Sequence, residues 1–189
     1  MSIFIGGGQD YYGPTAERDK EVVKRVATLL RKTQLPLQIV TGGTAGIPED
    51  FARHFGGLRL SGTQTVVNVI AAEYLETYKE RTRDYPQSYW VAAETHEQRR
   101  VALANNPDIK VGLFIQGGQF TTHEIWLFQE KGKKLVVFSG SGGASGGAIP
   151  YNGWSYVPPT GDKAYMSTDP DADVADIAYS LVQEILAVI

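Results

Sequence analysis

The chain has 189 residues, of which 42% are apolar and 21% charged, as expected of a soluble globular protein of one domain. Its net charge of −3 excludes a global basic field for nucleic acid, and no apolar run is long enough to span a membrane. It has no cysteine, which excludes disulfides, thiolate metal sites and a cysteine nucleophile, and which suits a cytoplasmic protein.

Short apolar runs alternate with helical patterns along the chain, and most of the runs are followed by glycine. Pro48 suits the first turn of a helix, and Gly132 suits the end of one. In chain order, we expect a strand at 3–5, a helix at 16–32, a strand at 37–40, a helix at 48–55, a strand at 66–70, a helix at 73–83, a strand at 89–92, a helix at 95–105, a strand at 110–115, a helix at 121–131, a strand at 135–138 and a helix at 171–188.

The alternation of strands and helices predicts an α/β protein of three layers, with a Rossmann-like, mostly parallel sheet in a single domain over residues 1–189. Glycine clusters follow at least four of the strands, and the carboxyl edge of such a sheet is where ligands bind. The Gly/Ser-rich residues 139–147 resemble a linker in composition. Because they follow a core strand and precede a helix that the sheet needs, we predict a mobile loop at the ligand edge instead.

Residues 113–124 read Leu-Phe-Ile-Gln-Gly-Gly-Gln-Phe-Thr-Thr-His-Glu, an apolar strand that runs through a glycine pair into a helix. Backbone N–H groups at such a junction favour an anion such as phosphate, beside which Glu124 would lie. The alternative is a structural role: Thr121 and Glu124 have the spacing of a capping box, in which the side chain of each accepts a hydrogen bond from the backbone amide of the other. The glycine pair before them favours a site.

Two earlier glycine clusters, at 6–8 and 41–46, are further candidates for ligand contact. Neither completes the dinucleotide fingerprint, and a P-loop is missing from the sequence, so classical NAD or ATP binding is not supported. The three histidines lack ligand-like spacing, and we predict neither a metal nor a cofactor.

Residues 3 to about 140 resemble the LOG-like proteins, long mislabelled "lysine decarboxylase-like", a family related to molybdenum-cofactor carriers. The family signature Pro-Gly-Gly-x-Gly-Thr-x-x-Glu aligns with residues 116–124, where the glycine pair, the threonine and the glutamate match. Gln116 and Phe120 differ from it, and we expect the Phe120 side chain to crowd the phosphate loop. The family's Met-x-x-Arg-Lys aligns with 95–99, which places Gln98 at the arginine; a shift of one residue places Arg99 there.

The resemblance implies a nucleotide or similar phosphorylated small molecule as the ligand and a homodimer or higher homo-oligomer as the assembly. Hydrolytic members of the family split the N-glycosidic bond of a nucleoside 5′-monophosphate, which is the alternative function. A scaffolding role is a third possibility. The candidate catalytic residues are Glu124 and Arg99. The candidate ligand-binding residues are Gly7, Gly8, Gly42, Gly43, Gly117, Gly118, Gln119, Thr121 and Thr122.

Overall fold

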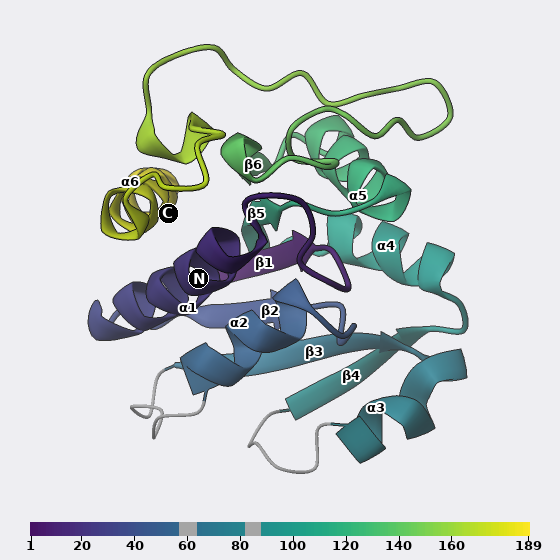
Figure 1. The fold of residues 1–189 in the computed structure, drawn as a ribbon. Coiled ribbons are helices and arrows are strands. Elements are labelled where there is room, and N and C mark those ends of the chain that lie inside the picture. The colour runs from purple at the N-terminus through teal and green to yellow at the C-terminus, as the bar shows by residue number, and fades with distance from the viewer. Residues whose placement is uncertain (57–63, 82–87) are drawn as a thin grey trace.

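The computed structural model describes residues 1–56, 64–81 and 88–189, which form a sheet of six strands between layers of helices (Figure 1). The strands are β1 (Ser2–Gly7), β2 (Gln38–Thr41), β3 (Thr65–Ala71), β4 (Ser88–Ala93), β5 (Ile109–Ile115) and β6 (Lys134–Phe138). The helices are α1 (Ala16–Lys32), α2 (Ile47–Gly56), α3 (Leu75–Arg81), α4 (His96–Asn105), α5 (Gln119–Glu130) and α6 (Val174–Val188). Short 3-10 turns lie at Ala72–Tyr74, Ser139–Ser141 and Ala164–Met166.

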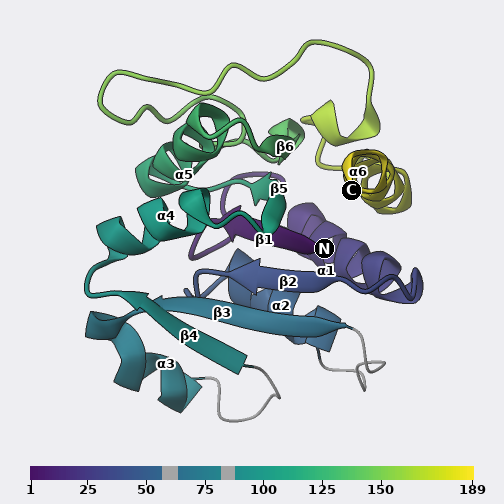
Figure 2. The ribbon, with the colours of Figure 1, turned by 180° about the vertical axis from the view of Figure 1, so that it is seen from behind.

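The strand order is β4-β3-β2-β1-β5-β6, and every neighbouring pair is parallel. The chain builds outward from β1 to β4, then returns to the other side of β1 to add β5 and β6 (Figure 2). The strand order therefore reverses between β1 and β5. In open parallel sheets, the crevice beyond the carboxyl ends of the strands at that reversal is the usual place for a ligand.

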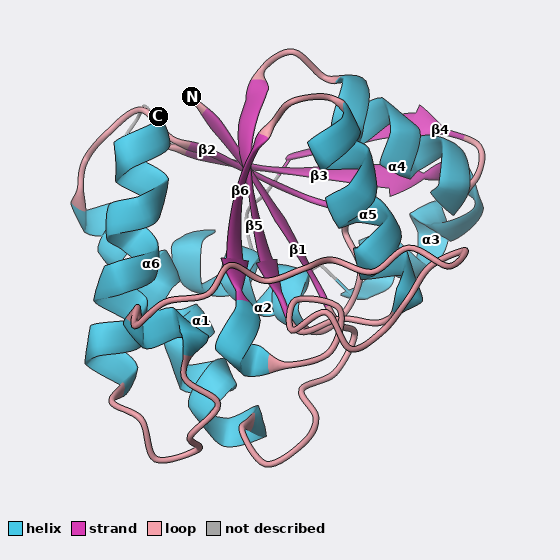
Figure 3. Ribbon diagram, turned by 90° about the horizontal axis from the view of Figure 1, so that it is seen from above, coloured by secondary structure: helices cyan, strands magenta, loops and turns pink. Residues whose placement is uncertain are grey.

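Helices cover both faces of the sheet, and the central strands β1, β2 and β5 are accordingly buried on both sides over most of their length. Helices α1, α2 and α6 lie on one face and α4 and α5 on the other, as the view from above makes plain (Figure 3). On the second face Phe128 of α5 packs against Phe4 and Phe114, with ring centroids 5.0 and 5.4 Å apart. The predicted three-layer α/β fold with a parallel sheet is confirmed.

The elements lie where the sequence placed them, with shifts at their ends. The helix expected at 121–131 begins earlier, at Gln119, and the one expected at 171–188 begins later, at Val174, where the Asp173 side chain caps it. The pattern at 73–83 forms a 3-10 turn followed by α3, and residues 82–83 lie outside the described residues. Within the described ranges, none of the helices combines the length and apolar character that crossing a bilayer requires.

The Gly/Ser-rich segment after β6 is neither a linker nor a loose loop. Ser139, Ser141 and Ser145 are buried. The Ser141 hydroxyl accepts from the Gln116 amide at 2.9 Å, and the Ser145 amide and hydroxyl donate to the Gln116 carbonyl at 3.1 and 3.0 Å. The serines thus pair the backbone groups left free at the end of β5. The segment lies at the predicted edge, but the prediction of a mobile loop is wrong, because composition does not reveal these hydrogen bonds.

Candidate functional site

A cavity of about 390 Å³ opens at the carboxyl edge of the sheet, over the ends of β1 and β2 and between the starts of α4 and α5. This is the point where the strand order reverses. The backbone of β1 supplies one wall through its terminal glycines, which bring no side chains to fill the space. The residues that line the cavity are Phe4, Ile5, Gly6, Gly7, Gly8, Gln9, Gly42, Thr44, Pro48, Tyr74, His96, Arg99, Arg100, Gly118, Phe120, Thr121 and Glu124.

The turn from β5 into α5 depends on two residues with positive φ, Gln116 at 50° and Gly117 at 94°. A β-carbon on Gly117 would overlap the Thr121 side chain, so the turn needs glycine there. Gly118 follows as the N-cap, and its carbonyl accepts the first helical bonds from the amides of Thr121 and Thr122 at 3.0 and 3.1 Å. The chain thus enters α5 two residues before Thr121.

No side chain caps α5. The structural alternative, a capping box, is wrong, because Thr121 is already inside the helix and Glu124 lies a full turn from its start. The first amides of a helix have no partner carbonyl within it, and here they begin at the cavity. A β-carbon built on Gly118 meets no atom within 4 Å, so the space in front of this helix start is open. The arrangement suits an anion.

The side chain of Gln116 fixes the turn from β5 into α5 by hydrogen bonds to the region around the start of α1. The LOG-like signature has proline at this position. The buried Gln116 side chain accepts from the Tyr12 amide at 3.2 Å, donates to the Tyr12 carbonyl at 3.1 Å, and donates to an Asp19 carboxylate oxygen at 2.8 Å. The Tyr12 hydroxyl donates to the Gly117 carbonyl at 2.7 Å. The loop before α5 is therefore joined to the loop before α1 by three hydrogen bonds, and to α1 itself by a fourth.

Arg99 and Glu124 form an ion pair within the cavity wall, with Nη2 and Oε1 3.3 Å apart. The exposed fraction is 3% for Arg99 and 8% for Glu124. Nη1 of Arg99 also donates to the carbonyl of Gly42, where a β-carbon would overlap the guanidinium. Burial raises the pKa of the Glu124 carboxyl, and the cations of Arg99 and Arg100 oppose that rise.

The start of α4 explains why Arg99, and not Gln98, lies in the cavity wall. The Thr95 hydroxyl accepts from the Gln98 amide at 3.3 Å, and the exposed Gln98 side chain reaches back to the amide of Glu94 at 3.2 Å. Gln98 is therefore part of the helix cap. The next residue around the helix is Arg99, which turns inward. This geometry favours the alignment that is shifted by one residue.

Four side chains form what we call the aromatic rim of the cavity: Tyr74, His96, Arg100 and Phe120. The rings of Tyr74 and His96 are 4.2 Å apart, and the Arg100 guanidinium lies 4.3 Å from the Phe120 ring centroid. Burial, together with Arg99 and Arg100, lowers the pKa of His96 to about 4, so its ring is neutral at pH 7. The expected crowding by Phe120 is wrong: its ring stacks on Arg100 and stays 53% exposed.

The structure brings seven of the eleven predicted site residues to this cavity: Glu124, Arg99, Gly7, Gly8, Gly42, Gly118 and Thr121. The other four, Gly43, Gly117, Gln119 and Thr122, do not line it. Gly43 and Gly117 shape backbone turns with positive φ, and the Thr122 hydroxyl donates to the Ile149 carbonyl at 2.6 Å. In the part of the chain that the structure describes, no cluster of His, Asp or Glu is placed to hold a metal ion.

Sequence reasoning missed the aromatic rim. A signal was present, since His96 and Arg100 are four residues apart at a helix start that follows a strand, which places them on one face at the ligand edge. Tyr74 and Phe120 gave no such signal, because their stacking partners come from another element.

No protein-family model matches the chain, and the search of curated proteins returned no match. Among solved structures it is similar to the X-ray structure of TM1055, a structural genomics target, with 20% sequence identity and a TM-score of 0.51. The similarity covers 76% of this chain and 77% of that one. It supports the class of fold, a parallel Rossmann-like α/β sheet.

Proposed function

We propose that the protein binds a nucleotide or a similar phosphorylated small molecule in this cavity, as a LOG-like protein. The observation that carries the proposal is the uncapped start of α5, which opens on a cavity where the strand order of the sheet reverses. The phosphate would accept from the amides at Gly118–Phe120, which no helix carbonyl can reach.

Two further features support this ligand class. The cavity volume of about 390 Å³ suits one small molecule, because pockets for such ligands span about 300–1,000 Å³. The alignment shifted by one residue also improves the resemblance: His96-Glu97-Gln98-Arg99-Arg100 then follows the family's Met-x-x-Arg-Lys with arginine at the fourth position and a cation at the fifth.

The proposal is tested by giving α5 a cap of its own. Gly118→Asp places a carboxylate at an N-cap whose φ of −99° and ψ of −163° suit aspartate. The carboxylate would occupy the amides that we assign to phosphate and would repel it. We expect isothermal titration with AMP and with ribose 5-phosphate to show at least about a hundredfold loss of affinity, while the melting temperature stays equal or rises.

Gly118→Ala is the matched control, because a β-carbon there meets no atom and the extended backbone accommodates alanine. It should bind within about threefold of the parent. If Gly118→Asp binds either ligand as well as Gly118→Ala does, the phosphate is not at α5. If the parent chain binds no nucleoside monophosphate, nucleotide sugar or pterin at millimolar concentration, the proposal fails.

The ion pair of Arg99 and Glu124 favours a second candidate function, hydrolysis of a nucleoside 5′-monophosphate. With the phosphate at α5, Glu124 would lie beside the ribose and stabilise positive charge at the anomeric carbon as the bond to the base breaks. Water would add to that carbon, one of its protons would pass to the leaving base, and ribose 5-phosphate would remain. Arg99 would position the substrate and help keep Glu124 ionised.

Release of free base from AMP tests this second function. We expect Glu124→Gln to lower the rate by at least about a hundredfold. Glu130→Gln, an exposed carboxylate at the far end of the same helix, is the control and should leave the rate unchanged. Equal rates in the parent and in Glu124→Gln would make Glu124 a structural residue.

We also propose a homodimer, which the LOG-like resemblance implies. Sedimentation velocity at micromolar concentration tests it: a single species with the mass of one 20.7 kDa chain would contradict the dimer.

A further inference from the structure

We propose that the aromatic rim is a second subsite, which binds the flat heteroaromatic base of a nucleotide while the start of α5 holds its phosphate. The inference rests on the proposed function, and it narrows the ligand from any phosphorylated small molecule to one that carries a base.

The exposure of the rim is the first support. Tyr74 is 46% exposed and Phe120 is 53% exposed, and both belong to the small set of large apolar side chains that the described residues leave open to solvent. Both also line the cavity that holds Glu124 and the start of α5. Flat apolar surface at the mouth of a polar cavity is where a base would gain by stacking.

The way the rim is built is the second support. His96 and Arg100 lie on one face of α4, and each carries an aromatic ring from another element: Tyr74 on His96 and Phe120 on Arg100. Glu97 accepts from Arg100 at 2.9 Å and so holds the guanidinium under the Phe120 ring. The Tyr74 and His96 rings are tilted by 43° to each other, and the Arg100 guanidinium lies over the Phe120 ring, so the two pairs place flat side chains along the lining of the same cavity.

An unpartnered atom is the third support. Within the described residues, Nδ1 of His96 is buried and has no hydrogen-bond partner, which is costly for a polar atom. The His96 ring is neutral near pH 7, so one of its ring nitrogens donates and the other accepts. A heteroaromatic base carries both kinds of group on its edge, so a base beside the rim would give this ring a hydrogen-bond partner once the His96 side chain rotates.

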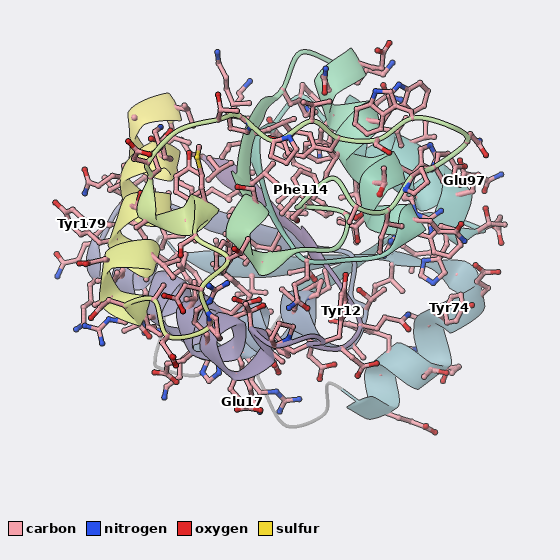
Figure 4. The ribbon with its side chains drawn as sticks, turned by 45° about the horizontal axis from the view of Figure 1, so that its top comes forward. Tyr12, Glu17, Tyr74, Glu97, Phe114 and Tyr179 are labelled. Carbon is pink, nitrogen blue, oxygen red and sulfur yellow. The ribbon has the colours of Figure 1, made fainter. Side chains whose placement is uncertain are left out.

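The experiment compares two ligands that share a phosphorylated ribose and differ in the base. Isothermal titration of the full chain is run with AMP and with ribose 5-phosphate, on the parent, Phe120→Ala, Tyr74→Ala and Tyr179→Ala. The last is the control, an exposed tyrosine of α6 on the side of the molecule opposite Tyr74 (Figure 4).

We expect the parent to bind AMP at least about tenfold more tightly than ribose 5-phosphate. Phe120→Ala and Tyr74→Ala should each weaken AMP by about tenfold and leave ribose 5-phosphate within about twofold. Tyr179→Ala should change neither affinity. Alanine at 120 is compatible with the first turn of α5, so the fold is retained.

Three results would overturn the subsite. Equal affinities for AMP and ribose 5-phosphate would remove the base subsite and leave the phosphate site intact. An unchanged AMP affinity in Phe120→Ala, with a loss of self-association in sedimentation, would make the rim a contact between copies of the chain. Failure of the parent to bind either ligand would overturn both this subsite and the proposed function.

Discussion

Helices α4 and α5 both begin at the cavity, but they begin in opposite ways. The start of α4 is closed by side chains: Thr95 accepts from the Gln98 amide, and Glu73 accepts from the His96 amide at 3.0 Å. The start of α5 has glycine as its N-cap and no side-chain cap. Helix α6, away from the cavity, is closed too, by Asp173. Helix α1 also lacks a side-chain cap, but of these two uncapped starts only that of α5 lines the cavity at the reversal of the sheet.

The comparison of α4 with α5 shows that the fold gives up a side-chain cap, and the helix stability that comes with it, at the start of α5. A side-chain N-cap stabilises a helix by about 1 kcal/mol relative to alanine and by only a few tenths of a kcal/mol relative to glycine, so the glycine N-cap of α5 forgoes that smaller contribution. The chain does not lack the residues for it, because Thr121 and Glu124 have capping-box spacing. The turn at Gln116 and Gly117 instead starts the helix early and leaves its first amides open. A phosphate would supply what the missing cap does not.

The largest effect on this comparison is expected at Gly117. Gly117→Ala forces a side chain onto a φ of 94° and into the Thr121 side chain, and we expect the free energy of unfolding to fall by about 3 kcal/mol. Gly118→Ala, one residue later, meets no steric conflict and should lower it only by the difference between glycine and alanine at an N-cap, less than about 1 kcal/mol. Urea unfolding of both variants measures this. Equal losses would mean that the turn does not depend on the backbone of Gly117.

A smaller effect separates the two threonines. Thr95→Val removes the hydroxyl that caps α4 at nearly constant volume, and we expect a loss of about 1 kcal/mol in unfolding free energy. Thr121→Val removes a hydroxyl that caps nothing and should cost much less, within about 0.3 kcal/mol of the parent. A thermal melt of each variant beside the parent is enough. A larger loss at 121 than at 95 would reverse our assignment of the capped and open helices.

The smallest effect is a dependence on pH at the start of α4. His96 has a pKa of about 4 in the folded chain, below its ordinary 6.5, so folding disfavours its protonation. Its contribution is therefore complete above pH 6.5 and is lost as the pH falls from 6.5 towards 4. Between pH 7 and 5 we expect a loss of about 0.5 kcal/mol after solvent screening. In His96→Gln, the free energy of unfolding should lack this part of the loss. If the parent and His96→Gln lose the same free energy between pH 7 and 5, the lowered pKa of His96 is contradicted.

The sequence was sufficient for the sheet but not for the details of the helix starts. Apolar runs that end in glycine identify parallel strands and their carboxyl edge without tertiary information. Capping boxes are less certain, because both Thr95-His96-Glu97-Gln98 and Thr121-Thr122-His123-Glu124 fit the pattern. At the first, Thr95 caps the helix while Gln98 reaches the amide of Glu94; at the second, neither side chain caps, since the backbone of the preceding turn decides where a helix begins.

The position of Arg99 is a second detail that could not be predicted from the sequence alone. Its place in the cavity depends on which of 98, 99 and 100 faces inward, and a helix advances by 100° per residue, so an error of one residue in alignment moves the side chain to a different face. The buried pair with Glu124 joins residues 25 apart in sequence. Local patterns carry no information on such a contact, whereas the glycine that admits the guanidinium, Gly42, was visible as part of a strand-end cluster.

The Gln116 side chain has a consequence for how this chain folds and evolves. It joins residues 104 positions apart in sequence, so the turn before α5 takes its final shape only after β1 and β5 have paired. A ligand held there would bind the folded chain alone and would raise its melting temperature with concentration. Substitutions at Tyr12, Asp19 and Gln116 should likewise be non-additive, because they share one set of hydrogen bonds. We therefore expect substitutions in the two loops to be correlated among related sequences.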